Sequence, residues 1–89
     1  MSNETYLNHP TFGMLYRVCQ LEENQELFTT LYAQRLFFLV TMTTEGVNFE
    51  PVSRSECRQL VEKRLRNLLR SGAAVEHQKL SKIYKRTFQ

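Results

Sequence analysis

The sequence predicts an α+β fold in which a small five-stranded β-barrel precedes a C-terminal hairpin of two helices. Residues 1–52 alternate apolar and polar side chains at the period of a β-strand, and turn signals interrupt this alternation repeatedly. Residues 53–89 change to the spacing of an amphipathic helix. A chain of 89 residues has room for one small domain and an appendage, so we expect the barrel in 1–52 and the helical hairpin in 53–89.

The expected strands are bounded by proline, glycine and polar turns. Pro10 ends the first strand because proline fixes its own φ and restricts the residue before it. Gly46 supplies the positive φ of a hairpin turn. The strands are expected at 4–8, at 12–21, on either side of a polar break at Gln34-Arg35 within 26–42, and at 47–52. Short strands with tight turns are typical of SH3-like and Tudor-like barrels, which close their edges in little sequence.

The stretch from Glu26 to Met42 is the most apolar part of the chain and gives the first functional signal. After its polar break, residues 36–42 are hydrophobic on both faces of the expected strand. If a small domain has a single interior, some of these side chains must lie on the surface as a partner-binding patch. The candidates for this patch are Tyr32, Leu36, Phe37 and Phe38, around Arg35.

The two helices have clear start and stop signals. Ser53 and Glu56 form a capping box, in which each side chain accepts a hydrogen bond from the other residue's amide. The first helix is therefore expected over 54–70, and Gly72 ends it as the residue after the C-cap. A second helix is expected over about 73–86, and the short connection folds it back on the first.

Charge is divided unevenly along the chain and leaves two classes of function open. Residues 1–52 carry two Lys or Arg against six Glu, a net charge of −4, whereas residues 53–89 carry ten against three, a net charge of +7. Two modules with different partners, or two that attract each other, would explain this division. The chain is then either a protein-binding module or a small RNA-binding or ribosome-associated SH3-like module that uses its basic helices. The net negative charge of the expected barrel argues against RNA binding.

No common catalytic or metal-binding motif is present. The sequence lacks a Gly-rich phosphate loop, HExxH, GxSxG and paired Cys-His clusters, so we expect no enzyme, cofactor or metal. Cys19 and Cys57 are expected to be buried small hydrophobes, and His9 and His77 to be solvated or hydrogen-bonded. No apolar run approaches the roughly 20 residues of a membrane span, and the N-terminus lacks signal-peptide features, which predicts a cytoplasmic location.

Four runs carry a more specific resemblance. They are Tyr6-Leu7-Asn8-His9-Pro10-Thr11-Phe12-Gly13, Glu26-Leu27-Phe28 with 30–40, Phe49-Glu50-Pro51, and Lys85-Arg86-Thr87-Phe88-Gln89. Together they closely resemble the PipX family, the PII-interacting protein X of cyanobacteria. The likeness covers essentially the whole chain at the same length, and the run Leu-Tyr-Ala-Gln-Arg-Leu-Phe-Phe-Leu-Val at 31–40 is a specific match.

The resemblance implies a non-enzymatic adaptor with a Tudor-like domain, two helices and two alternative partners. One partner is NtcA, a nitrogen-control transcription activator that the family co-activates in its 2-oxoglutarate-loaded form. The other is the trimeric signalling protein PII, which sequesters the adaptor when 2-oxoglutarate is scarce and releases it when 2-oxoglutarate and ATP are bound.

The resemblance also implies where the partners bind. The implied shared surface consists of Glu4, Tyr6, Phe12, Tyr32, Gln34, Arg35, Leu36, Phe38 and Arg54. A Tyr-rich apolar patch with an Arg is also the composition of a binding hot spot. We expect 2-oxoglutarate and ATP or ADP on the partners only. A contact between the helices and RNA polymerase stays open, and no direct contact with DNA or a membrane is expected.

Overall fold

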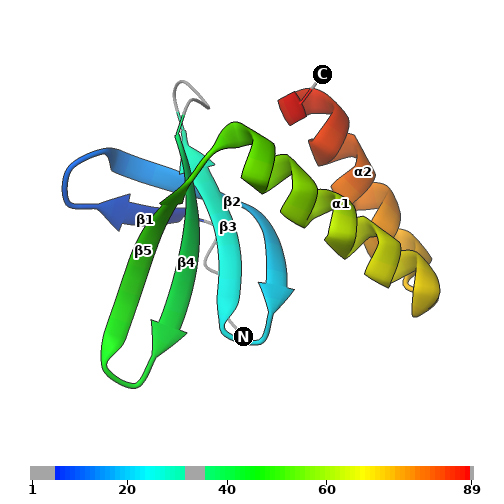
Figure 1. Cartoon of the computed structure of the whole chain (residues 1–89), viewed down its shortest axis with the longest axis horizontal. Coiled ribbons are helices and arrows are strands. Elements are labelled where there is room, and N and C mark those ends of the chain that lie inside the picture. Colours follow the sequence, from blue (N-terminus) through cyan, green and yellow to red (C-terminus); the bar gives the residue numbers. More distant parts are fainter. Residues whose placement is uncertain (1–5, 32–35, 89) are drawn as a thin grey trace.

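The computed structural model describes residues 6–31 and 36–88, which form a five-stranded sheet and two helices (Figure 1). The elements are β1 (Tyr6–His9), β2 (Gly13–Glu22), β3 (Gln25–Thr30), β4 (Phe37–Thr43), β5 (Gly46–Val52), α1 (Arg54–Arg70) and α2 (Ala74–Phe88). Each strand pairs antiparallel with the next along the chain, and the sheet curls into a half-barrel. The predicted α+β class, with a Tudor-like sheet ahead of a helical hairpin, is confirmed.

Local sequence signals place the ends of the elements. Gly46 and Gly72 have positive φ values of 135° and 80°, as the turns require. The capping box is present: the Ser53 amide donates to the Glu56 carboxylate at 2.9 Å, and the Glu56 amide donates to the Ser53 hydroxyl at 3.0 Å. The helix α1 has the predicted bounds, whereas α2 continues past residue 86 to Phe88.

The sheet has two buried faces, which corrects the expectation of a single interior. Phe37 lies in a core cluster with residues from both helices, whereas Phe38 lies in a second cluster inside the curl of the sheet. They are 2% and 3% exposed, so neither contributes an exposed ring to a surface patch. Adjacent strand residues point to opposite faces, and a helical layer over one face buries both sets. Of the candidates for the surface patch that lie in the described part of the chain, only Leu36 is exposed.

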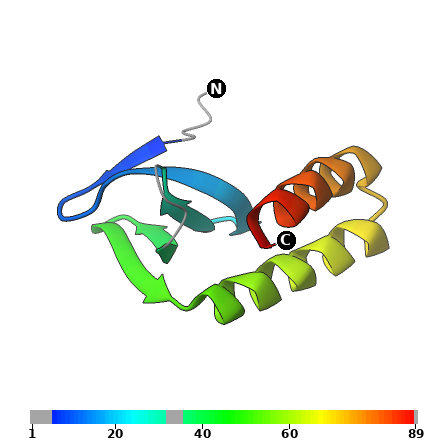
Figure 2. The same ribbon diagram turned by 90° about the horizontal axis from the view of Figure 1, so that it is seen from above.

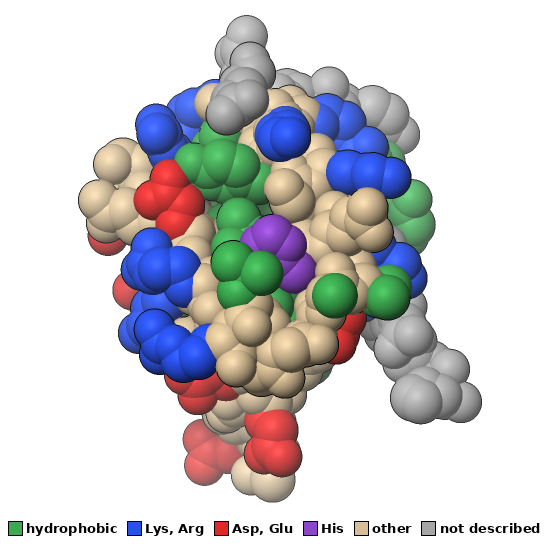
Figure 3. Space-filling model, turned by 90° about the vertical axis from the view of Figure 1, so that its right-hand side faces the viewer, with side chains coloured by type: hydrophobic (Ala, Val, Ile, Leu, Met, Phe, Trp, Pro, Cys, Tyr) green, Lys and Arg blue, Asp and Glu red, His purple; other side chains and the backbone are tan. Residues whose placement is uncertain are grey.

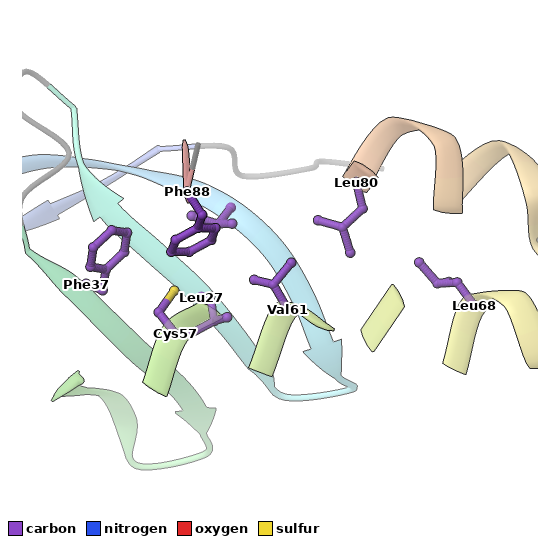
Figure 4. Close-up of a cluster of buried hydrophobic side chains, with 8 residues drawn as sticks. Leu27, Phe37, Cys57, Val61, Leu68, Leu80 and Phe88 are labelled. Atoms are coloured by element: carbon purple, nitrogen blue, oxygen red, sulfur yellow. The ribbon is translucent and has the colours of Figure 1, made fainter. Parts of the chain in front are cut away.

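The helices share the larger cluster with the sheet. It contains Val18, Leu27, Phe37, Cys57, Val61, Leu68, Leu80 and Phe88. Figure 4 shows Cys57 and Val61 pointing from α1 towards Leu27 of the sheet. Figure 2 shows the two helices side by side next to the sheet, and the last turn of α2 lies close to the start of α1. Burial of this cluster holds the hairpin on the sheet.

A polar clasp made by Arg58, Glu62 and Tyr84 joins the two helices. The Tyr84 hydroxyl donates to the Glu62 carboxylate, and the Arg58 Nε donates both to the Tyr84 oxygen at 3.2 Å and to Glu62 at 3.3 Å. This clasp lowers the pKa of Glu62, mainly through the tyrosine hydrogen bond. Neither helix of the described part of the chain is long and apolar enough to cross a membrane.

Candidate protein-binding site

An apolar groove lies where the start of β4, the end of β5 and the first turn of α1 meet. Its volume is about 280 Å³. Its lining residues are Phe12, Leu36, Phe37, Phe38, Pro51, Val52, Ser53 and Arg54, and we call it the docking groove. Six of these eight side chains are hydrophobic, and Arg54 contributes the one formal charge. Such a lining favours an apolar side chain of a partner with a carboxylate nearby.

Four of the predicted site residues meet in this groove. Phe12 and Leu36 are 50% and 41% exposed, and Arg54 is also exposed. Phe38 forms the floor, because its ring is 3% exposed. The assignment of Phe38 to a partner surface stays a prediction, in which this buried residue supports the more exposed ones. The buried ring of Phe38 lies beneath the more exposed side chains of the groove and supports them.

The other predicted site residues have different positions. Tyr6 is on β1 with 52% of its surface exposed, and it does not line the docking groove. Glu4, Tyr32, Gln34 and Arg35 lie outside the described residues. For these four, the assignment to a partner surface stays a prediction.

Backbone hydrogen bonds fix Leu36 at the rim of the groove. The carbonyl of Leu36 accepts from the Thr29 hydroxyl at 2.8 Å and from the Thr30 amide at 3.2 Å. Thr29 is fully buried, so its hydroxyl needs such a partner. The exposed leucine side chain is thus held beside the start of β4 by its own main chain.

His9 is the residue whose role the sequence analysis missed. Its Nδ1 accepts hydrogen bonds from the amides of Thr11 and Phe12 at 3.0 and 3.2 Å, which shapes the turn after β1. Its ring contacts those of Phe12, Phe38 and Phe49, with centroids 4.9–5.0 Å apart. His9 therefore sets the position of Phe12 in the groove. The His-Pro pair marked the turn but carried no signal for the aromatic contacts.

This aromatic cluster is filled rather than hollow. The ring of Phe38 is 5.7 Å from that of Phe12 and 6.4 Å from that of Phe49. An aromatic cage for a methylated ammonium group needs open space within about 6 Å of several ring faces. Here the rings contact one another, so the cluster offers a continuous apolar surface instead of a cation cage.

Arg54 joins the docking groove to the end of α2. Its guanidinium lies 5.2 Å from the ring centroid of Phe88, and that ring stacks on Phe37 at 5.8 Å with an interplanar angle of 24°. A cation over an aromatic face is attracted to it and loses freedom. The positive charge at the groove is therefore held by the C-terminal turn.

The cysteines do not provide reactive groups. Burial is the main cause that raises the pKa of both Cys19 and Cys57 to about 12. Both thiols are therefore protonated at neutral pH and unsuited to nucleophilic chemistry. Among the described residues, no group of three or more His, Cys, Asp and Glu side chains is placed to hold a metal ion.

The curled sheet, helical hairpin and apolar, arginine-edged groove define a small protein-binding module of the α+β class. A comparison with protein-family models matches residues 3–88 to PipX, PII-interacting protein X. The chain belongs to this family. The family description identifies its members by their interaction with PII. A search of the curated proteins gave no match.

Proposed function

We propose that this protein is a non-enzymatic adaptor of nitrogen control in the cytoplasm, with PII and NtcA as alternative partners. PII sequesters it when 2-oxoglutarate is low, and it co-activates 2-oxoglutarate-bound NtcA when 2-oxoglutarate is abundant. The observation that carries this proposal is the docking groove. It gathers Phe12, Leu36, Phe38 and Arg54, which are residues of the surface that the PipX resemblance implies for both partners.

The size of the sheet supports mutually exclusive binding. A stable interface needs roughly 800 Å² from each partner, and a sheet of about fifty residues that keeps a core lacks two separate patches of that size. Most large hydrophobic side chains of β3 and β4 are buried in the two clusters. Both partners would then draw on the docking groove and its surroundings, including Tyr6 and the predicted residues Glu4, Tyr32, Gln34 and Arg35.

The metabolites would act through the partners. Among the described residues, the lining of the docking groove has one guanidinium and mainly apolar side chains, which does not suit a dicarboxylate or a nucleotide. We place 2-oxoglutarate and ATP or ADP on PII and NtcA, and any ligand that weakens PII binding then raises the free pool of adaptor by linkage. Apart from Arg54, the basic residues of the two helices that the structure describes do not line the docking groove, and we propose that they contact RNA polymerase.

Competition between purified proteins tests the proposal. PII without 2-oxoglutarate should displace the protein from NtcA, and 2-oxoglutarate with ATP should restore the complex. The full chain with Leu36→Glu serves as the binding-deficient variant and should fail with both partners. A ternary complex with both partners on the sheet, or binding of 2-oxoglutarate to the chain alone, would refute it. Retention of RNA from an extract in place of both proteins would favour the RNA-binding alternative.

A further inference from the structure

One ring nitrogen of His9 holds the turn between β1 and β2. Its Nδ1 accepts hydrogen bonds from the amides of Thr11 and Phe12 at 3.0 and 3.2 Å. Only an unprotonated nitrogen has a lone pair with which to accept, so the imidazole here is neutral and carries its proton on Nε2. Reversing the ring would put a carbon atom opposite the two amides, and carbon cannot accept. The turn therefore needs one tautomer of an uncharged ring.

Protonation of His9 would remove this acceptor. Imidazolium carries a proton on both nitrogens, so no rotation of the ring offers a lone pair to the amides of Thr11 and Phe12. The new Nδ1–H would instead meet two N–H groups of the same polarity. The ring is also half-buried among apolar side chains, where a charge is unfavourable. The turn then has to open, so that both amides can reach water.

This turn carries Phe12 to the docking groove. The ring of His9 lies 5.0 Å from that of Phe12, 5.0 Å from that of Phe38 and 4.9 Å from that of Phe49, measured between centroids. Phe12 lines the groove with half of its surface exposed, above the buried ring of Phe38. His9 thus holds Phe12 twice, through its amide and through its ring. Opening the turn would release one wall of the docking groove.

The strands around His9 offer little charge to its ring. On β4 and β5 the one charged residue is Glu50, which follows Phe49 and points to the opposite face of the sheet. On β2, Gly13 lies opposite His9, and the first titratable residue after it is Tyr16, further along the strand. Among the described residues, His9 has no ion pair with a carboxylate that would stabilise its protonated form.

The remaining charge near the turn is positive. Arg54 lines the docking groove together with Phe12, and its charge opposes a second positive charge on His9. The other basic residues of the helices are remote from this turn: Figure 3 shows Lys and Arg side chains on the helical side of the molecule. The state of the turn therefore depends mainly on the proton of His9 itself.

We propose that His9 makes the docking groove sensitive to pH: the neutral imidazole holds Phe12 in place for a partner, and protonation releases it and weakens binding. Histidine is the side chain that changes its charge between about pH 5 and 8. The apparent affinity of a site falls in proportion to the fraction of molecules in the binding-competent form. This inference rests on the proposed function, because it concerns the groove to which we assign PII and NtcA.

An NMR titration of the full chain from about pH 7.5 to about pH 5 tests the switch without a partner. We expect the ring resonances of His9 and the amide resonances of Thr11 and Phe12 to shift with one common midpoint. In His9→Asn both amides should keep their positions, because the asparagine oxygen accepts but does not titrate. The matched control is His77→Asn, at the chain's other histidine, and it should keep the wild-type titration of the turn.

Calorimetry with PII in the absence of 2-oxoglutarate tests the effect on binding. The wild-type affinity should fall about fivefold or more between about pH 7.5 and pH 5.5. The fall should be smaller in His9→Asn, where only the other titratable groups of the two proteins contribute. His77→Asn should follow the wild type.

Three results would overturn this inference. They are a His9 ring that does not titrate above about pH 5, turn amides that do not follow the ring, and an equal fall of PII affinity in the wild type and His9→Asn. Failure of the proposed function has a different signature. Coupled shifts in a chain that does not bind PII at either pH would contradict the proposed function and support the switch in the turn.

Discussion

The guanidinium of Arg54 lies 5.2 Å from the ring centroid of Phe88, so the first turn of α1 contacts the last turn of α2. The same phenylalanine ring stacks on Phe37 of β4. One aromatic side chain thus connects a strand, both helices and the charged edge of the docking groove. The stability of the helical hairpin and the position of this charge depend on the same contact.

Replacing Leu36 tests the docking groove directly. Leu36→Glu should weaken PII binding by about thirtyfold, because a hot-spot side chain contributes about 2 kcal/mol. Titration calorimetry measures the affinity, and thermal melting should show little change because the side chain is exposed. Val47→Glu is the control, since Val47 is 50% exposed on β5 and lies outside the groove. Equal losses of PII affinity in Leu36→Glu and Val47→Glu would exclude a specific role for Leu36.

Two replacements of His9 separate its hydrogen bonds from its ring contacts. His9→Asn supplies an oxygen near the place of Nδ1, so the amides of Thr11 and Phe12 should stay protected from hydrogen exchange. His9→Ala removes the acceptor, and both amides should exchange faster. PII affinity should fall in both variants, and more in His9→Ala, because Phe12 is no longer held. Identical exchange in the two variants would show that the turn does not need the acceptor.

Removing the Phe88 ring should destabilise the whole chain. Phe88→Ala should cost about 3 kcal/mol of unfolding free energy, as expected for a large aromatic side chain that is mostly buried. Urea denaturation measures this loss. The control is Val75→Ala on the same helix, where the side chain is 66% exposed and the expected change is within about 0.5 kcal/mol. If Phe88→Ala loses less unfolding free energy than the control, the end of α2 does not pack against the sheet in solution.

Acidification should weaken the start of α1. The backbone hydrogen bond from Ser53, followed by the side-chain hydrogen bond, lowers the pKa of Glu56 from its ordinary value of 4.5. The folded state therefore binds fewer protons there than the unfolded state, so the stabilisation is present above pH 4.5 and is lost as the pH falls through the lowered pKa.

Thermal melting between pH 3 and 7 measures this effect, and Glu56→Gln should flatten the acid side of the profile. Glutamine still accepts the hydrogen bond from Ser53 but does not titrate. Glu45→Gln in the turn before β5 is the control. An unchanged slope in Glu56→Gln would assign the acid sensitivity to other carboxylates.

Both cysteines should resist alkylation in the folded protein. A thiol pKa raised from 9.0 to about 12 reduces the thiolate fraction roughly a thousandfold. Iodoacetamide at pH 8 should therefore label Cys19 and Cys57 only after urea unfolds the chain, as measured by mass spectrometry. Labelling of Cys19 alone without urea would show that its partial exposure outweighs the protonation.

Local signals account for the part of the structure that sequence could predict. Ser53, Glu56 and Gly72 act on neighbouring backbone groups, so the bounds of α1 follow from a few adjacent residues. Alternation likewise put Phe37 and Phe38 on opposite faces of β4. It could not show that both faces are buried, because the layer over Phe37 comes from residues 57–88.

Apolar residues on the two helices show the same limit. Leu69 and Val75 fit the apolar spacing but are 62% and 66% exposed, since the hairpin does not turn them towards the sheet. Phe88, near the end of the second helix, is buried because it reaches Phe37 and Arg54. At the docking groove, sequence and resemblance pointed to Phe12, Leu36 and Arg54. The role of His9 depends on rings from three separate segments and needed the structure.

The strand order has a consequence for how the chain folds. Because every strand pairs with its neighbour in sequence, the sheet can assemble as successive hairpins with short loop closures, which are rapid. The stack of Phe37 on Phe88 joins residues far apart in sequence and should form last. We expect Phe88→Ala to speed unfolding while leaving the refolding rate nearly unchanged, and stopped-flow kinetics in urea would reveal this asymmetry.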